Sequence, residues 1–213
     1  MEKRLVVSMA CGEESRDIAK ITMPHIQAYA LKCGADFHLV SQVDDSYKHL
    51  GYQKFNYVNL PYDRILHIDA DMLVKESTPN LFDVVGRENF AGVDEHPYED
   101  RLTHLRKYCE DPSFYINVGM YLFNVENHRH IFNREVQELD VMYYEQTHIN
   151  ILLNNSEFQT HLLPWNYNCM FIMEDAGHSK DDAYIIHYAG KYRGLTHEKL
   201  LEVIKTDERK YFV

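Results

Sequence analysis

The strongest constraint on the fold is a regular alternation of strand-like and helix-like segments between residues 5 and 68. The apolar pattern predicts strands and helices in strict alternation, at Leu5–Ala10, about Ser15–Lys32, Phe37–Val43, about Tyr47–Leu60 and Arg64–Ile68. Strand, helix, strand, helix, strand is typical of a parallel sheet whose faces are covered by helices. We therefore expect an α/β fold.

The pattern after Thr78-Pro79 is less regular, because a polar stretch over Glu95–Asp111 separates the remaining apolar segments. The same reasoning predicts strands at Phe90–Val93, Tyr115–Val125, His161–Leu163 and Ala183–His187, and helices at about Ile131–Tyr144, Thr147–Leu153 and Thr196–Lys205. No repeat or linker interrupts the chain, so we expect a single domain over residues 1–213.

The charge balance limits the classes of partner. Acidic residues outnumber basic ones by 33 to 22, which gives a formal net charge of -11. A protein whose whole surface binds nucleic acid is therefore excluded, because backbone phosphates need a cationic footprint. An acidic chain can still bind a nucleotide diphosphate where a divalent cation supplies the positive charge.

Cysteine spacing and hydropathy bear on the compartment. There is no CxxC pair and no disulfide framework, so reduced thiols are expected at Cys11, Cys33, Cys109 and Cys169. The first apolar run is too short for a signal peptide, and no run has the length of a membrane span. We expect a soluble, cytoplasmic protein.

Two carboxylates interrupt the apolar run that begins at Arg64. Asp69 and Asp71 follow the predicted strand directly and are separated by Ala70. Ligands gather beyond the carboxyl ends of strands in open α/β sheets, so this position favours a site over the core. A turn at Ala70 would let both carboxylates reach one hard cation. An isolated Asp-X-Asp is more often a capped turn beside a solvated side chain, and here the context favours the metal.

Several segments in the same order resemble the family 8 glycosyltransferases, which include glycogenin, galactinol synthases and bacterial lipooligosaccharide galactosyltransferases. Tyr62–Val74 is similar to the family's strand and DxD segment. Four later segments resemble its F-N-S-G-V, D-Q-x-x-L-N, L-P-x-x-(W/Y)-N and H-F-x-G-x-x-K-P-W motifs, namely Tyr115–Met120, Glu145-Gln146 with Asn150, Leu163–Asn168 and Ile186–Gly194. An ordered set is far more specific than any single motif.

The resemblance implies a GT-A fold, which is Rossmann-like, with a mixed, mostly parallel central sheet flanked by helices. It implies a metal held by Asp69, Asp71 and His187, a UDP-linked sugar as the nucleotide-sugar donor, and a glycan or other hydroxyl acceptor. Two oxygens and one nitrogen suit Mn²⁺, with Mg²⁺ as a substitute. Three departures from the motifs, at Val118, Glu145 and Arg193, put the identity of the donor sugar in doubt.

The candidate catalytic residues are Asp71, Gln146 and Arg193. The candidate contacts to the metal and nucleotide sugar are Ser8, Ala10, Cys11, Lys54, Asp69, Ala70, Asp71, Asn117, Glu145, Gln146, His187, Gly190, Lys191 and Arg193. Ser8, Ala10 and Cys11 are equally well explained as ordinary residues at a strand end, and Lys191 as part of a solvated basic turn. Gln146 is favoured over Asn117, which lies within an apolar strand.

Stereochemistry and rival functions leave alternatives open. The resemblance implies retention of the anomeric configuration, whereas an inverting enzyme would need a carboxylate base, for which Asp94, Glu95, Glu145 and Asp175 are all candidates. A metal-dependent phosphohydrolase or nucleotidyltransferase would also use paired aspartates, but it usually gathers more carboxylates around two metals. A carbohydrate-binding module without catalysis is the other rival.

Overall fold

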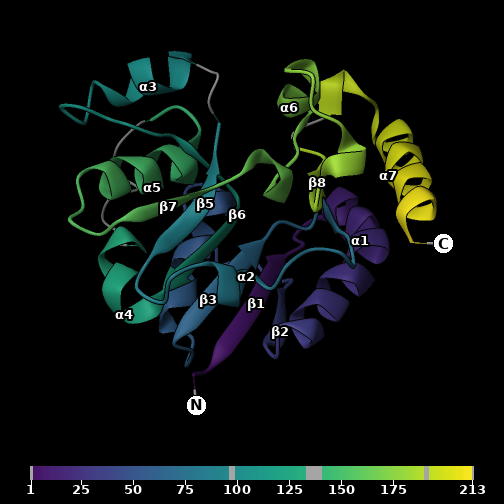
Figure 1. The fold of residues 1–213 in the computed structure, drawn as a ribbon, viewed down its shortest axis with the longest axis horizontal. Helices are drawn as coiled ribbons and strands as arrows, with labels where there is room; N and C mark the ends of the chain where they lie inside the picture. The colour runs from purple at the N-terminus through teal and green to yellow at the C-terminus, as the bar shows by residue number, and fades with distance from the viewer. Residues whose placement is uncertain (1, 96–98, 133–140, 190–191, 213) are drawn as a thin grey trace.

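The computed structural model describes residues 2–95, 99–132, 141–189 and 192–212, without the side chains of Glu99 and Arg193. Its centre is a six-stranded sheet in the order β2-β1-β3-β6-β5-β7 (Figure 1). In chain order these strands are β1 (Arg4–Met9), β2 (Asp36–Val40), β3 (Arg64–Ile68), β5 (Phe90–Asp94), β6 (Ile116–Asn124) and β7 (Thr160–Leu163). The predicted strands thus lie within a few residues of their observed bounds.

The sheet is mixed and mostly parallel, as expected. β1 pairs in parallel with both β2 and β3, and β5 pairs in parallel with β7. β6 runs against both of its neighbours, β3 and β5. The parallel strands therefore end at one edge of the sheet, where open α/β folds place their ligands.

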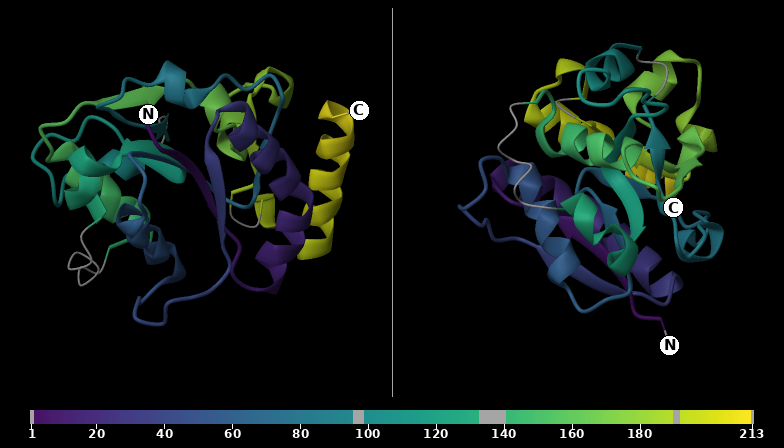
Figure 2. Two further views of the ribbon diagram at one scale, coloured as in Figure 1. Left: turned by 90° about the horizontal axis from the view of Figure 1, so that it is seen from below. Right: turned by 90° about the vertical axis from the view of Figure 1, so that its left-hand side faces the viewer.

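A separate pair of short strands extends this edge. β4 (Met72–Val74) pairs in antiparallel fashion with β8 (Ile185–His187), with Met72 opposite His187. Residues that are more than a hundred positions apart in the sequence thus become neighbours just beyond the end of β3. Helix α7 (His197–Tyr211) follows and packs against α1 (Glu13–Lys32) on the outside of the molecule (Figure 2).

Two hydrophobic clusters cover the two faces of the sheet. Because side chains alternate along a strand, Val6 and Leu66 face the cluster that contains α1, and Leu5 and Ile65 face the other. The second cluster contains aromatic side chains of η1 (Leu50–Asn59) and part of α5 (Tyr144–Asn154). The shorter elements around these layers are α2 (Leu81–Val84), α3 (Glu99–Leu105), α4 (Val125–His128), η2 (Arg129–Phe132), η4 (Trp165–Tyr167), α6 (Phe171–Asp175), η5 (Lys180–Asp182) and η6 (Tyr192–Gly194).

Several predicted helices differ from the structure. The α-helix predicted at Tyr47–Leu60 is the 3₁₀ helix η1, whose Gly, Tyr, Asn and Val residues have weak α-helical propensity and are largely buried. The helix predicted at Ile131–Tyr144 falls partly outside the described residues. Residues 141–143 at its described C-terminal end are not helical, and Tyr144 already begins α5; both Tyr143 and Tyr144 have positive φ angles, of 64° and 47°. α7 begins as expected after the N-cap Thr196 but runs on to Tyr211.

The structure also bears on the expected thiols and on membrane spans. All four cysteines are free and buried. Among the described residues, none of the helices combines the length and the apolar character that crossing a membrane requires.

Candidate active site

The acidic pair lies in a tight turn that joins β3 to β4. The backbone N–H of Asp69 donates to the carbonyl of Gly119 on β6 at 2.7 Å, and Met72 N–H donates back to the Asp69 carbonyl at 3.2 Å. Thr22 Oγ1 of α1 donates to the Ala70 carbonyl at 2.6 Å. The turn is therefore anchored to the sheet and to the first helix, with both carboxylates half-buried at the strand end.

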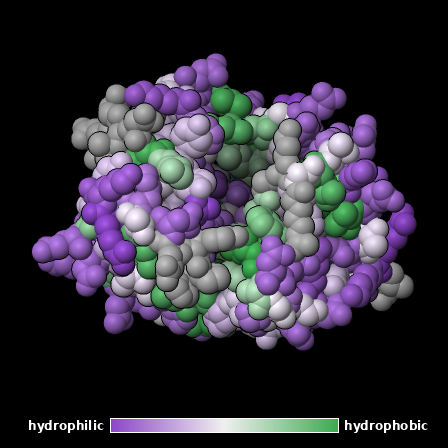
Figure 3. All heavy atoms as spheres, turned by 90° about the horizontal axis from the view of Figure 1, so that it is seen from above, coloured by the Kyte–Doolittle hydropathy of each residue, from purple (hydrophilic) through white to green (hydrophobic). Residues whose placement is uncertain are grey.

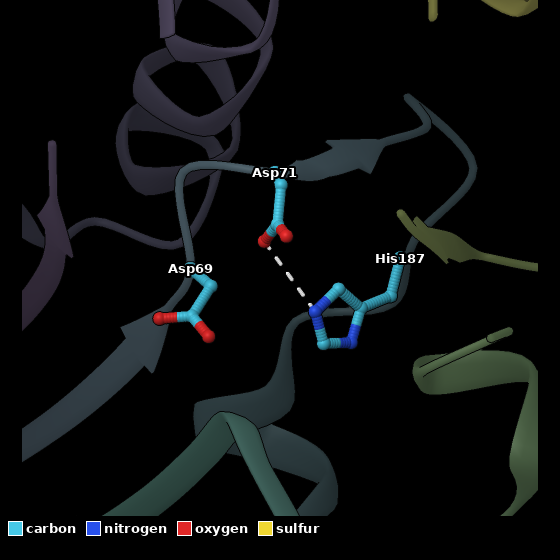
Figure 4. Close-up of side chains that lie close together, drawn as sticks. All are labelled: Asp69, Asp71 and His187. Atoms are coloured by element: carbon cyan, nitrogen blue, oxygen red, sulfur yellow. Dashed lines mark ion pairs between the residues drawn. The ribbon is translucent and has the colours of Figure 1, made fainter. Parts of the chain in front are cut away.

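His187 completes a cluster of three ligand-type side chains. The β4–β8 pairing places it beside Asp71, and its Nε2 lies 3.4 Å from Asp71 Oδ1. One ligand atom from each of Asp69, Asp71 and His187 falls within 4.8 Å of the other two, and the three side chains converge on a common space (Figure 4). Two carboxylates and an imidazole at this spacing fit a divalent cation such as Mn²⁺.

Gly119 explains how the imidazole reaches this position. A Cβ atom at residue 119 would overlap with Cε1 of the His187 ring and approach Asn117 Oδ1 to 2.8 Å. Glycine is thus needed for the close approach of β6 to the ring. Burial alone would lower the pKa of His187, but the neighbouring carboxylate of Asp71 outweighs it and raises the pKa.

Lys54 is a buried cation behind the acidic pair. It is 3% exposed, and its Nζ lies 3.0 Å from the Val118 carbonyl, 3.2 Å from Asp69 Oδ1 and 3.6 Å from Glu145 Oε1. Burial would lower the pKa of Lys54, and the two carboxylates raise it above its ordinary value. Burial would raise the pKa of Asp69, but Lys54 and then His67 hold it well below the ordinary range.

Oδ1 of Asp69 has two partners, since His67 Nε2 also approaches it to 2.7 Å. Burial and then the charge of Lys54 lower the pKa of His67, so its ring is neutral and Nε2–H donates to the carboxylate. The contacts of Oδ1 orient the Asp69 side chain and leave Oδ2 for another ligand. Sequence reasoning missed His67, because its place within an apolar strand gave no functional signal.

Glu145 contacts other groups besides Lys54. Its carboxylate lies 3.6 Å from His49 Nδ1 and folds over Gly51, where a Cβ atom would overlap with it. The His49 ring in turn stacks on Tyr144 at 3.8 Å between ring centroids. Glu145, the residue that departs from the D-Q motif, therefore has a matching glycine on η1 that accommodates its longer side chain.

Asn117 and Gln146 lie side by side across β6 and α5. Asn117 Nδ2 donates to Glu95 Oε1 at 2.7 Å and to Gln146 Oε1 at 3.3 Å, while its Oδ1 accepts from Gly119 N–H at 2.9 Å and from Asn168 Nδ2 at 3.0 Å. All four hydrogen-bonding positions of this amide are used. The Asn117 amide is thus fully bonded within the protein, while Gln146 Nε2 donates to Glu95 Oε1 at 3.1 Å.

A cavity of about 660 Å³ opens beside the acidic pair. The face at the carboxyl ends of the parallel strands is hollowed near its centre (Figure 3). The lining includes four of the predicted contacts, Cys11, Asp69, Ala70 and Asp71, together with the first turn of α1 and residues 195–197. Ser8 and Ala10 are fully buried and do not line this cavity, because their side chains point into the core against α1.

The remaining candidates are placed as follows. Gly190 and Lys191 fall outside the described residues, and Arg193 belongs to η6 without a described side chain. Asp94 accepts a hydrogen bond from Tyr115 N–H at 3.0 Å. Asp175, at the end of α6, lines a different cavity from the acidic pair.

Comparisons with known proteins agree with this arrangement. The family model described as glycosyl transferase family 8 matches residues 13–193, and no curated protein matches the chain. Solved structures with a similar fold include a glycosyltransferase involved in the glycosylation of the major capsid of PBCV-1, which is 14% identical, with a TM-score of 0.66 over 96% of this chain and 99% of that one.

Two further solved structures have a fold similar to that of this chain. The galactosyltransferase LgtC, solved in complex with donor and acceptor sugar analogues, is 14% identical, with a TM-score of 0.69 over 95% of both chains. The glycosyltransferase GlyE of Streptococcus pneumoniae TIGR4 is 14% identical, with a TM-score of 0.60 over 97% of this chain and 64% of that one. The structural likeness establishes the GT-A fold, and the family match establishes that this chain belongs to glycosyl transferase family 8 and is a glycosyltransferase.

Proposed function

We propose that the chain is a Mn²⁺-dependent transferase that moves a hexose or deoxyhexose from a UDP-linked donor to a glycan hydroxyl, with retention of configuration. The observation that carries the proposal is the convergence of Asp69, Asp71 and His187 beside a cavity large enough for a nucleotide. We extend the proposal to one domain over residues 1–213.

The donor atoms support manganese, with Mg²⁺ as a substitute. Asp69 Oδ2, a carboxylate oxygen of Asp71 and Nε2 of His187 would hold the ion. When bound, it supplies a Lewis acid that neutralises charge on the departing diphosphate. Such an ion would also offset the repulsion between the two carboxylates and a bound diphosphate.

The walls of the cavity support a nucleotide between the acidic pair and α1. Cys11 forms one wall, and burial raises the pKa of its thiol, so it offers a neutral surface. Ala70 lies between the two carboxylates and lines the same space. We assign Lys191 and Arg193 to the diphosphate by their position after His187 in the chain.

The sugar side of the site is assigned to Gln146 and Lys54. Gln146 lies in the first turn of α5, and its Oε1 accepts from Val118 N–H at 3.2 Å, which orients the amide. We assign this amide, which both donates and accepts, to a sugar hydroxyl. Lys54 holds Asp69 and Glu145 in place and is a positioning residue in this proposal.

The engagement of the nearby carboxylates supports retention. An inverting enzyme requires a carboxylate free to take a proton from the acceptor. Glu95 accepts from Asn117, Gln146 and Arg101, and Glu145 pairs with Lys54 and His49. Both carboxylates are bonded to other groups and are therefore poorly suited to act as the base of an inverting enzyme. This favours attack by the acceptor hydroxyl from the same face of the sugar as the leaving diphosphate, which does not need such a base.

The test is a donor panel. Protein with Mn²⁺ would be mixed with UDP-, GDP- and TDP-linked sugars, and release of free nucleoside diphosphate would be followed in the presence of glycan acceptors. We expect UDP release, and a product whose anomeric proton coupling matches that of the donor. Release of a monophosphate or pyrophosphate would contradict the proposal, and an inverted product would contradict its stereochemical part.

A further inference from the structure

A line of hydrogen bonds leads from His187 into the protein interior. His187 Nδ1 lies 2.8 Å from Asn168 Oδ1, Asn168 Nδ2 donates to Asn117 Oδ1 at 3.0 Å, and Asn117 Nδ2 donates to Glu95 Oε1 at 2.7 Å. All four residues are at most 7% exposed. The line thus joins β8, the segment after η4, β6 and the end of β5.

The direction of each bond follows from the inventory of donors and acceptors. A carboxylate only accepts, so Glu95 requires the NH₂ group of Asn117 to face it. The Asn117 oxygen then faces Asn168, which must present its own NH₂ group. The Asn168 oxygen is therefore left toward His187, and it can pair only with a protonated Nδ1.

The other arrangement would leave several groups unsatisfied. If Nδ1 carried a lone pair, Asn168 would have to flip its amide, and its oxygen would then face the oxygen of Asn117. A flip of Asn117 would in turn direct its oxygen at the Glu95 carboxylate and lose the bond from Gly119 N–H. A buried polar group without a partner destabilises the fold, so the first arrangement is favoured.

Glu95 is fixed at the far end of the line. Arg101 Nε donates to its second oxygen at 3.0 Å, and Gln146 Nε2 donates to its first at 3.1 Å. The guanidinium of Arg101 also lies 3.7 Å from the centroid of the Tyr143 ring. The carboxylate is thus held in one orientation by groups that do not belong to the line itself.

We propose that Asn168, Asn117 and Glu95 are positioning residues that hold His187 with Nδ1 protonated and Nε2 directed at the space shared with Asp69 and Asp71. A ligand histidine commonly donates its other N–H to a fixed acceptor, which sets its tautomer and raises its basicity. The inference deepens the proposed function, because its consequence for metal binding rests on the Asp69, Asp71 and His187 site. The tautomer itself does not.

The experiment has one readout without metal and one with it. In metal-free protein at alkaline pH, ¹⁵N chemical shifts report which nitrogen of the neutral His187 ring carries the proton. Mn²⁺ affinity is measured by calorimetry on the same samples. We expect Nδ1–H in the wild type, and in Asn168→Ala a shift toward Nε2–H with Mn²⁺ affinity lower by about 10- to 100-fold.

Three further variants define the line. Asn168→Asp keeps an acceptor for Nδ1–H, so the tautomer should persist. Glu95→Gln should weaken Mn²⁺ binding less than Asn168→Ala does, and combining the two should add nothing, because the line is already cut. Asn154→Ala removes three hydrogen bonds at the end of α5 that are not part of the line, and it should leave both readouts unchanged.

The outcomes separate the two proposals. An Nε2–H tautomer in the wild type, or an unchanged tautomer in Asn168→Ala, would overturn the positioning role. Additive losses in the double variant would remove Glu95 from it. Wild-type protein that shows the Nδ1–H tautomer but binds no Mn²⁺ would overturn the metal site alone.

Discussion

The two sides of the candidate site differ in how their polar side chains are paired. On one side Asp71 and His187 face each other and Asp69 across a space that opens into the cavity. On the other, Asn117 and Glu95 are buried and bonded to one another and to Gln146. The first side brings like charges together, whereas the second pairs each donor with an acceptor.

This difference indicates which side awaits a ligand. Two carboxylates close together repel each other unless a cation lies between them. A satisfied amide network needs no ligand and rigidifies its surroundings. One side of the site therefore has carboxylates that face an open space, and the other has hydrogen bonds that hold the site in shape. Such preorganisation is what transfer chemistry requires.

Asp71→Asn should break the charged side most severely. It keeps the shape of the side chain and removes one of two negative charges, so we expect Mn²⁺ affinity to fall by more than about 100-fold, beyond the range for residues that only support a ligand. Calorimetric titration measures the loss, and turnover should vanish with it. His187→Ala should behave in the same way. Normal metal-dependent turnover in either variant would refute the assigned ligands.

Lys54→Met should have the next largest effect, on stability rather than on chemistry. It leaves Asp69 and Glu145 beside each other without their cation, and breaking a buried pair typically costs about 3–5 kcal/mol. Chemical denaturation of metal-free protein measures the change. Lys20→Met is the matched control, because Lys20 pairs with Asp17 on the surface and should change stability by less than about 1 kcal/mol.

The dependence on pH sharpens this prediction. Burial raises the pKa of Glu145, but His49 and Lys54 lower it below its ordinary value overall. Its stabilising contribution is therefore present above the unfolded pKa of about 4.3 and is lost as the pH falls through the lower folded pKa. The raised pKa of Lys54 has the opposite sense, since its contribution is lost only as the pH rises above about 10.4.

The difference in unfolding free energy between wild type and Lys54→Met should thus be largest between these limits. It should narrow below about pH 4, where protonated carboxylates no longer need the lysine. Denaturation midpoints across pH 3 to pH 8 would follow it. A constant difference over that range would show that Lys54 acts through packing instead of charge.

Gly119→Ala tests the contact between the two sides. The added methyl group would overlap with the His187 ring, and overpacking of this kind typically costs about 1–3 kcal/mol. We expect displacement of the imidazole, weaker Mn²⁺ binding and a lower unfolding temperature. Gly86→Ala is the control, because its nearest contact is the flexible Asn89 side chain at 3.1 Å. Unaltered metal binding in Gly119→Ala would mean that the ring tolerates a shift.

Gly51→Ala should have the smallest effect. The new methyl group overlaps only with the carboxylate of Glu145, which is the end of a flexible side chain. We expect a loss of about 1 kcal/mol that Glu145→Asp offsets in the double variant, since the shorter side chain makes room. Thermal unfolding of the single and double variants completes the cycle. Additive losses would show that the glycine and the glutamate are not matched.

The sequence predicted the strands of the first half of the fold well, and it singled out the three side chains of the Asp69, Asp71 and His187 cluster. Strand β3 was predicted at its exact bounds, because a run rich in Ile and Leu ends at an abrupt acidic pair. The 3₁₀ form of η1 and the helix α3 were not predicted, since both depend on which faces are buried. The burial of Ser8 and Ala10 was not predicted either, because a position at a strand end does not say which face of the sheet a side chain points to.

By itself the sequence determined the alternating elements, the net charge and the order of the motifs, since each is a property of neighbouring residues. Only the tertiary structure decided that Asp69 and Asp71 meet His187, that the Asn117 amide is bonded to four protein groups, and that Glu95 ends the line of hydrogen bonds behind His187. The physical reason is that each hydrogen-bond donor or acceptor pairs with whichever group lies next to it in the folded protein, and not with its neighbours in the sequence. The partners in this site come from strands and turns that are far apart in the chain.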